Sequence, residues 1–199
     1  MTASSTFAAF WDVFVGKLAE LGGAEADTAI TVVLEALAKI DPRLSLFIGN
    51  HEDGHDAIFT LEGHYELGPV IDELLGSAPV LPDWRVIALL DSSLLFGDRN
   101  MVLFPDDENG GVLMQMAANG DQMWRARAID FLVTFPNELA AAQMGEGLMT
   151  GATVTVSRPL IPTHANLTLA EESLADHVAP LGGKVTHWSC LQVSPPRQK

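Results

Sequence analysis

The residues best suited to chemistry lie in one short polar segment in the first half of the chain. Five side chains with metal-binding groups follow one another closely: His51, Glu52, Asp53, His55 and Asp56. Imidazole and carboxylate groups are ligands for zinc and other divalent transition metals, which makes His51, Asp53 and His55 candidate metal ligands. An H-x-x-x-H pair binds a metal from one face of a helix, however, and Gly54 disfavours a helix here. The sequence therefore favours a solvated polar turn without a metal, and keeps a metal site as the alternative.

A second candidate is Trp188, which lies near the end of the chain beside His187 and the single cysteine, Cys190. Tryptophan is enriched among the residues that dominate protein–protein binding energies, so Trp188 could anchor a partner. In a strand, alternate side chains share a face, which puts Trp188 and Cys190 together and His187 opposite. This pattern favours burial of both Trp188 and Cys190 in a core.

Regular elements must position these residues, and the first half predicts the order α-α-β-β-α-β. Aromatic and aliphatic residues from Phe7 to Leu21 recur at helical spacing, and this stripe is predicted to pack in a core. The apolar segments 44–48 and 57–61 flank the polar segment and predict a β-hairpin. These elements form a predicted N-terminal unit, residues 1–95.

The second half predicts a further unit, residues 112–194, after a boundary between Asp91 and Gly111. A hairpin is expected from strands at 112–117 and 123–128. It is followed by alternating strands and helices, with strands at 129–134, 152–157 and 185–193 and helices at 136–149 and 168–179. The fold class is thus α+β, with two small α/β sandwich units.

Charge excludes some partners. The 199-residue chain has a formal net charge of −15, and its first 100 residues carry 5 basic and 16 acidic side chains. Such a surface repels nucleic-acid phosphates and anionic lipids, so we expect neither nucleic acid nor a membrane as a direct partner, but a protein with a basic face. A single cysteine and the lack of a signal peptide or membrane-spanning segment predict a cytoplasmic protein.

The C-terminal unit resembles the family of regulators of ribonuclease E activity, type B, over residues 129–193. The resemblance rests on the strand 131–135, the segment 158–162 beginning with Arg158, a helix with Glu171 and Glu172, and a last strand in which Gly182-Gly183 precedes Trp188. It implies a ferredoxin-like fold and non-catalytic inhibition of a ribonuclease by direct protein contact. It also marks candidate partner-binding residues: Arg158, Glu171, Glu172, His187 and Trp188. Where the family has Tyr-Asp-Gly before the tryptophan, this chain has Val185-Thr186-His187.

The N-terminal half, residues 7–90, resembles bacterial proteins of unassigned function. It shares with them the Phe10-Trp11-x-x-Phe14 pattern and the segment 78–87. No nucleophile elbow, phosphate-binding loop or dinucleotide fingerprint is present in the sequence, so we expect no cofactor and no enzymatic activity. The leading hypothesis is a non-enzymatic protein-binding regulator, for which the resemblance implies a ribonuclease as the target. The alternatives are a metal-binding module or metal-dependent enzyme, and an assembly module that forms a homodimer through sheet edges or the Phe/Trp helix.

Overall fold

The structure is a computed structural model that describes residues 3–23 and 26–193. These residues form an α+β fold with a three-stranded sheet and a four-stranded sheet, and they divide into two compact units. The N-terminal unit holds residues up to 99 together with 120–122, and the C-terminal unit holds 100–119 and 123–193. Residue 194, the predicted end of the second unit, lies outside the described residues. Across the described ranges, no helix is both long enough and apolar enough to cross a membrane.

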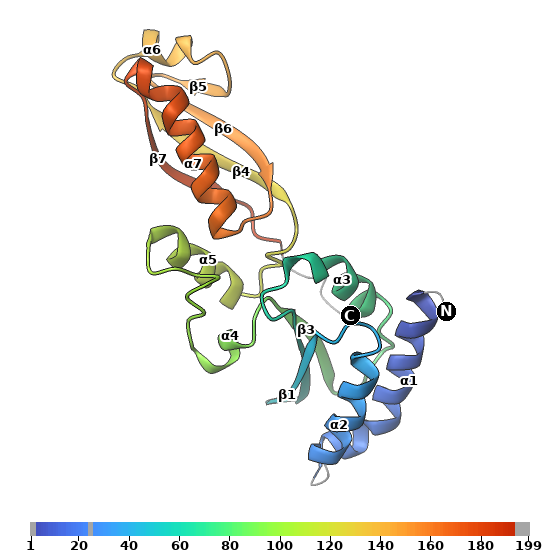
Figure 1. The fold of residues 1–199 in the computed structure, drawn as a ribbon. Coiled ribbons are helices and arrows are strands. Elements are labelled where there is room, and N and C mark those ends of the chain that lie inside the picture. The colour runs from blue at the N-terminus through green and yellow to red at the C-terminus, as the bar shows by residue number, and fades with distance from the viewer. Residues whose placement is uncertain (1–2, 24–25, 194–199) are drawn as a thin grey trace. The chain divides into compact units, whose positions relative to one another are not determined.

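The N-terminal unit has the predicted order α-α-β-β-α-β (Figure 1). Its elements are α1 (Ala3–Leu21), α2 (Ala26–Leu37), β1 (Ser45–His51), β2 (Gly54–Thr60), η1 (Tyr65–Leu67), α3 (Gly68–Gly76), β3 (Trp84–Leu89) and α4 (Ser93–Phe96). The sheet order is β1-β2-β3, in which β1 and β2 are an antiparallel hairpin. Because β2 and β3 are parallel, their connection needs a crossover, which α3 supplies.

The aromatic stripe of α1 packs in the core of this unit, as predicted. Phe10, Trp11 and Phe14 are each at most 3% exposed. The Trp11 indole N–H donates to the Leu74 carbonyl oxygen at 3.0 Å, which satisfies the one polar group that this ring buries. The stripe is therefore used inside the unit, and it leaves little for the helix-mediated dimer that the sequence kept open.

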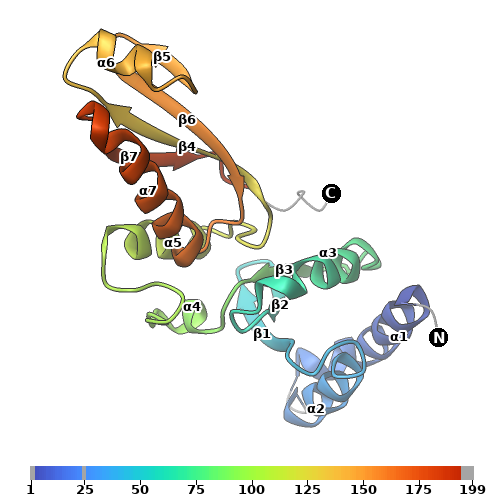
Figure 2. The same cartoon turned by 45° about the horizontal axis from the view of Figure 1, so that its top comes forward.

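The C-terminal unit is built around a fully antiparallel sheet with the order β5-β6-β4-β7. Its elements are α5 (Glu108–Ala118), β4 (Arg127–Thr134), α6 (Glu138–Gln143), β5 (Leu148–Thr150), β6 (Thr153–Leu160), α7 (His164–Val178), η2 (Ala179–Leu181) and β7 (Lys184–Cys190). Alternate residues of β4 and β6 are buried: Ile129, Phe131, Val133, Val154 and Val156. Figures 1 and 2 show α7 lying along one face of this sheet, with the much shorter α6 at one end.

The predicted hairpin of strands 112–117 and 123–128 is wrong. Residues 112–117 belong to α5, which starts where the Asp107 carboxylate accepts a hydrogen bond from the Gly110 N–H at 2.7 Å. This N-cap satisfies a backbone donor that the first helical turn leaves unpaired. Leu113, Met116 and Ala117 are buried at helical spacing, and the next strand begins only at Arg127.

Both helices predicted in the C-terminal unit have different bounds. The first ends at Gln143 instead of residue 149, because Gly145 and Gly147 adopt positive φ values of 75° and 87°. The chain then forms the short strand β5. The second helix starts at His164 instead of residue 168, since the Thr163 hydroxyl accepts from the Asn166 N–H at 3.1 Å and caps it there.

Candidate functional site

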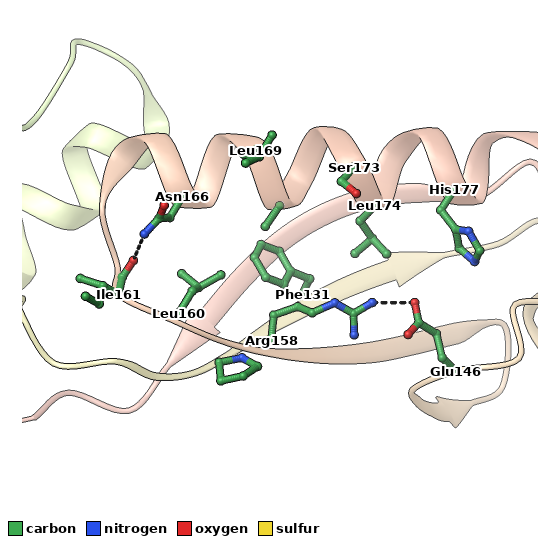
Figure 3. Close-up of a pocket in the computed structure, with 12 residues that line it drawn as sticks. Phe131, Glu146, Arg158, Leu160, Ile161, Asn166, Leu169, Ser173, Leu174 and His177 are labelled. Atoms are coloured by element: carbon green, nitrogen blue, oxygen red, sulfur yellow. Dashed lines mark hydrogen bonds and ion pairs between the residues drawn. The ribbon is translucent and has the colours of Figure 1, made fainter.

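A groove of about 580 Å³ lies between α7 and β6 in the C-terminal unit (Figure 3). We call it the α7–β6 groove. It has a mixed apolar and polar lining: Phe131, Glu146, Arg158, Pro159, Leu160, Ile161, Asn166, Leu169, Ala170, Ser173, Leu174 and His177. Pockets that bind small ligands typically measure about 300–1,000 Å³, so the groove has room for a ligand or for side chains of a partner.

The groove exists because the helical layer over the sheet is incomplete. Even-numbered residues of β6 face α7, and the first two of them, Val154 and Val156, are buried. Arg158 and Leu160 continue the same face but are only half-buried. Because α6 is short, it does not cover the part of the sheet that holds Arg158 and Leu160. These side chains, which a longer helix would bury, therefore remain accessible.

Apolar side chains line the inner wall and rim of the groove. Phe131 and Leu174 lie at its base and are at most 5% exposed, whereas Leu169 on α7 is 67% exposed at its rim. Figure 3 shows the Leu160 and Leu174 side chains between the helix and the strand, and the Leu169 side chain on the helix itself. When a partner covers an exposed leucine next to buried apolar groups, the removal of apolar surface from water favours binding.

One ion pair marks the polar end of the groove. The Arg158 guanidinium donates to a Glu146 carboxylate oxygen at 2.7 Å, and both side chains are about two-fifths exposed. His177 lies further along α7 at the same end (Figure 3). Water screens this pair, so it contributes little to stability, and a bound partner can exchange contacts with either member at low cost.

Three of the five candidate partner-binding residues come together beside the groove helix. The Trp188 indole N–H donates to Asn109 Oδ1 at 2.6 Å, and Asn109 Nδ2 donates to the Glu171 carboxylate at 2.6 Å. His187 lines the same small hollow as Trp188 and Glu171. Asn109 thereby ties α5 to both α7 and β7.

The other two candidates lie elsewhere in the unit. Arg158 lines the α7–β6 groove, whereas Glu172 is exposed on α7 and lines neither hollow. The predicted burial of Trp188 and Cys190 is wrong, because both side chains are only half-buried. β7 is an edge strand of the sheet, so its residues are covered by a neighbouring strand on one side only.

The His51–Asp56 segment forms a tight hairpin and not the broad polar turn that the sequence predicts. Asn50 lies opposite His55 in the register and His51 lies opposite Gly54, so the two histidines are on opposite faces of the sheet. Among residues 3–23 and 26–193, no group of three or more His, Cys, Asp and Glu side chains is arranged to hold a metal ion.

Two of the three candidate ligands, His51 and His55, each have one ring nitrogen in contact with a protein group. His55 Nδ1 lies 2.7 Å from Asn50 Oδ1, and its ring lies over Trp84 with centroids 4.8 Å apart. The backbone N–H of Asp53 donates to His51 Nδ1 at 3.2 Å. On the His51 face, Arg85 makes two hydrogen bonds to the buried Asp56 carboxylate, at 2.7 and 2.9 Å, and this bonding raises the pKa of Arg85.

Sequence reasoning missed Glu146, His177 and Asn109. Glu146 stands between two glycines in what looked like a continuous helix, and those glycines were the available signal for a chain break. Asn109 is 62 residues from Glu171 and 79 from Trp188, so only the tertiary fold reveals its role.

Comparison with known proteins finds no match. No protein-family model matches this chain, and neither a curated protein nor a solved structure does. The resemblance to ribonuclease regulators therefore stays a prediction from the sequence.

Proposed function

We propose that this protein is a non-enzymatic regulator that binds a partner protein through the α7–β6 groove, and that the partner is a ribonuclease. The observation that carries the proposal is the groove itself, in which the exposed Leu169 stands at the rim of an apolar wall that ends in the Arg158–Glu146 pair. An apolar centre with a charged rim is the usual anatomy of a protein-binding surface.

The order of elements supports the family part of this proposal. From β4 to β7 the chain runs β-α-β-β-α-β, which is the order of ferredoxin-like units, and all neighbouring strands of the sheet are antiparallel. The resemblance to the ribonuclease regulators implies this fold, so the topology and the sequence pattern agree. One of the residues that carry the resemblance, Arg158, lines the groove.

Charge limits the chemistry of the partner surface. With a net charge of −15, the chain favours a partner segment that carries basic residues beside its apolar ones. In this proposal an apolar side chain of the partner packs on Leu169 and Leu160, and a basic side chain competes with Arg158 for Glu146. Direct binding to RNA is not part of the proposal, since phosphates would meet the same negative charge.

A matched pair of leucine variants tests the site. Leu169 and Leu139 are both exposed helical residues of the C-terminal unit, at 67% and 72%, but only Leu169 lines the groove. Tagged wild-type protein, Leu169→Asp and Leu139→Asp would be used for capture from a lysate of the native host, with and without nuclease treatment. We expect a ribonuclease to be captured by the wild type and Leu139→Asp, and capture by Leu169→Asp to fall at least tenfold.

The captured ribonuclease would then be purified and its RNA cleavage measured with each variant present. Inhibition by the wild type and Leu139→Asp, but not by Leu169→Asp, supports the proposal. Capture of the protein alone would contradict the ribonuclease assignment. Equal capture by all three variants would contradict the assignment of the groove.

A further inference from the structure

A different surface, in the N-terminal unit, is the outer edge of β1. In the three-stranded sheet β1 pairs with β2 on one side only, so within the described residues its other side has no neighbouring strand. A separate hollow of about 380 Å³ lies between β1 and the connection from α1 to α2, where Leu46 and Ile48 face residues such as Ala26. An exposed strand edge presents a row of unpaired N–H and C=O groups that can accept another strand.

The hydrogen bonds of β2 determine which groups of β1 face this edge. The N–H groups of His55 and Leu61 donate toward β3, to Asp83 at 2.8 Å and to Leu89 at 3.2 Å. Odd-numbered residues of β2 therefore bond to β3 and even-numbered ones to β1, where the register pairs them with odd-numbered residues such as Phe47 and Gly49. The backbone groups of the even-numbered residues Leu46, Ile48 and Asn50 consequently point outward.

The other three edges carry features that discourage pairing, and β1 carries none. β3 follows Pro82 and contains Arg85, β5 has only three residues, and β7 begins with Lys184 and pairs irregularly with β4. Short strands, charged side chains, prolines and bulges are the devices by which proteins protect sheet edges. The sequence of β1, Ser-Leu-Phe-Ile-Gly-Asn-His, contains no proline, lysine, arginine or carboxylate.

We propose that β1 pairs antiparallel with β1 of a second copy of this chain, which joins two three-stranded sheets into one continuous sheet. The register that overlaps all of Ser45–His51 is centred on Ile48. It sets Leu46 opposite Asn50 of the second copy and Ile48 opposite Ile48, so every outward-facing residue meets an outward-facing residue. A shift by one residue would lose this match.

Side chains fit the same register. Phe47 comes opposite Gly49 of the second copy, where an aromatic ring can cover a glycine that has no side chain of its own. The N-terminal half has a strong negative charge, and β1, which bears no carboxylate, is where two copies can approach with least repulsion.

This self-complementarity is why the occupant is a second copy and not a strand of another protein. A two-fold contact uses the same surface on both partners, and after one pairing no open β1 edge remains, so assembly stops at a dimer. The dimer presents two C-terminal units, and its formation does not depend on the proposed function of the α7–β6 groove.

Two variants of Asn50 test the edge. Asn50→Pro removes an outward N–H without breaking the β1–β2 ladder, and Asn50→Ala keeps that N–H while losing the same side-chain contact to His55. Light scattering over a wide range of concentrations should give twice the mass of one chain for the wild type and Asn50→Ala, and one chain's mass for Asn50→Pro. A wild type that stays monomeric throughout, or an Asn50→Pro protein that stays dimeric, would overturn the proposal.

Disulfide trapping tests the register, with Cys190→Ser as the background so that the introduced cysteine is the only one. Ile48→Cys places two cysteines across the two-fold axis with Cα atoms about 5.5 Å apart, within the reach of a disulfide. Ser45→Cys places them six residues apart in register, roughly 20 Å. We expect a cross-linked dimer on oxidation for Ile48→Cys only. Cross-linking of Ser45→Cys, or failure of a dimeric Ile48→Cys protein to cross-link, would overturn the register.

Discussion

The two units leave different parts of their structure exposed. The N-terminal unit has a tightly closed core and an open sheet edge, whereas the C-terminal unit has protected edges and an open groove beside its core. The first exposes main-chain groups, which can pair with another strand. The second exposes side chains, which recognise a particular surface. The two proposals therefore place assembly and partner recognition in different units of the chain.

The closed core of the N-terminal unit comes from aromatic packing. Phe14 is fully buried, with ring centroids 6.1 Å from Phe10, 5.5 Å from Trp11 and 5.6 Å from Trp84. The contacts with Trp11 and Trp84 are edge-to-face, an arrangement that stabilises a core beyond the area that it buries. In the C-terminal unit the corresponding layer has one long helix, α7, and the short α6, and the α7–β6 groove is the space that this imbalance leaves.

Truncation of the aromatic core should have the largest effect. Phe14→Ala removes a fully buried ring that contacts Phe10, Trp11 and Trp84, and we expect it to lower the free energy of unfolding by about 3–5 kcal/mol. Urea denaturation followed by circular dichroism would measure the change. Phe96→Ala is the matched control, since Phe96 is 67% exposed and should change the same quantity by less than about 1 kcal/mol. Similar losses for both variants would mean that the core is less closed than the structure shows.

Titration of the single tyrosine, Tyr65, tests how closed the N-terminal unit is, and its expected effect is intermediate in size. Burial, and then the nearby Asp91 carboxylate, raise the pKa of Tyr65 from 10.0 to about 12. The unfolded chain would lose this proton first, so the stability contributed by Tyr65 is complete below pH 10 and is lost as the pH rises toward 12. Ultraviolet absorbance should show ionisation about two pH units later in the native protein than in urea. A native midpoint near 10, with the circular dichroism unchanged, would contradict the burial of this phenol.

The sequence predicted the N-terminal unit well because its signals are strong and local. The stripe that contains Phe10, Trp11 and Phe14 fits only a helix, and the two apolar segments around a polar turn fit a hairpin. The turn itself was misjudged. The strands extend to His51 and Gly54, so polar residues that were expected in a loop form the ends of two strands.

The C-terminal unit was harder to predict because its signals are ambiguous. Residues 112–117 alternate poorly and also fit a helix, and the Asp107 side chain that caps this helix lies outside the segment. The three residues of β5 are too few to show any periodicity. At the candidate site, the resemblance marked Arg158, Glu171 and Trp188, but their partners Glu146 and Asn109 depend on tertiary contacts.

Loss of the Asn109 bridge should have the smallest effect of the three. It tests whether hydrogen bonds hold α5 in the C-terminal unit, as aromatic packing holds α1 in the N-terminal unit. Asn109→Ala leaves the Trp188 indole N–H and the Glu171 carboxylate without their partner in a partly buried site, at an expected cost of about 1–3 kcal/mol. Asn119→Ala, at the exposed end of the same helix, should cost less than about 0.5 kcal/mol. Urea denaturation would give both values, and hydrogen exchange should be faster across α5 in Asn109→Ala alone. Equal stability of the two variants would mean that Leu113 and Met116, on the buried apolar face of α5, are sufficient to hold this helix. Apolar packing would then stabilise both units, and the units would differ only in their surfaces.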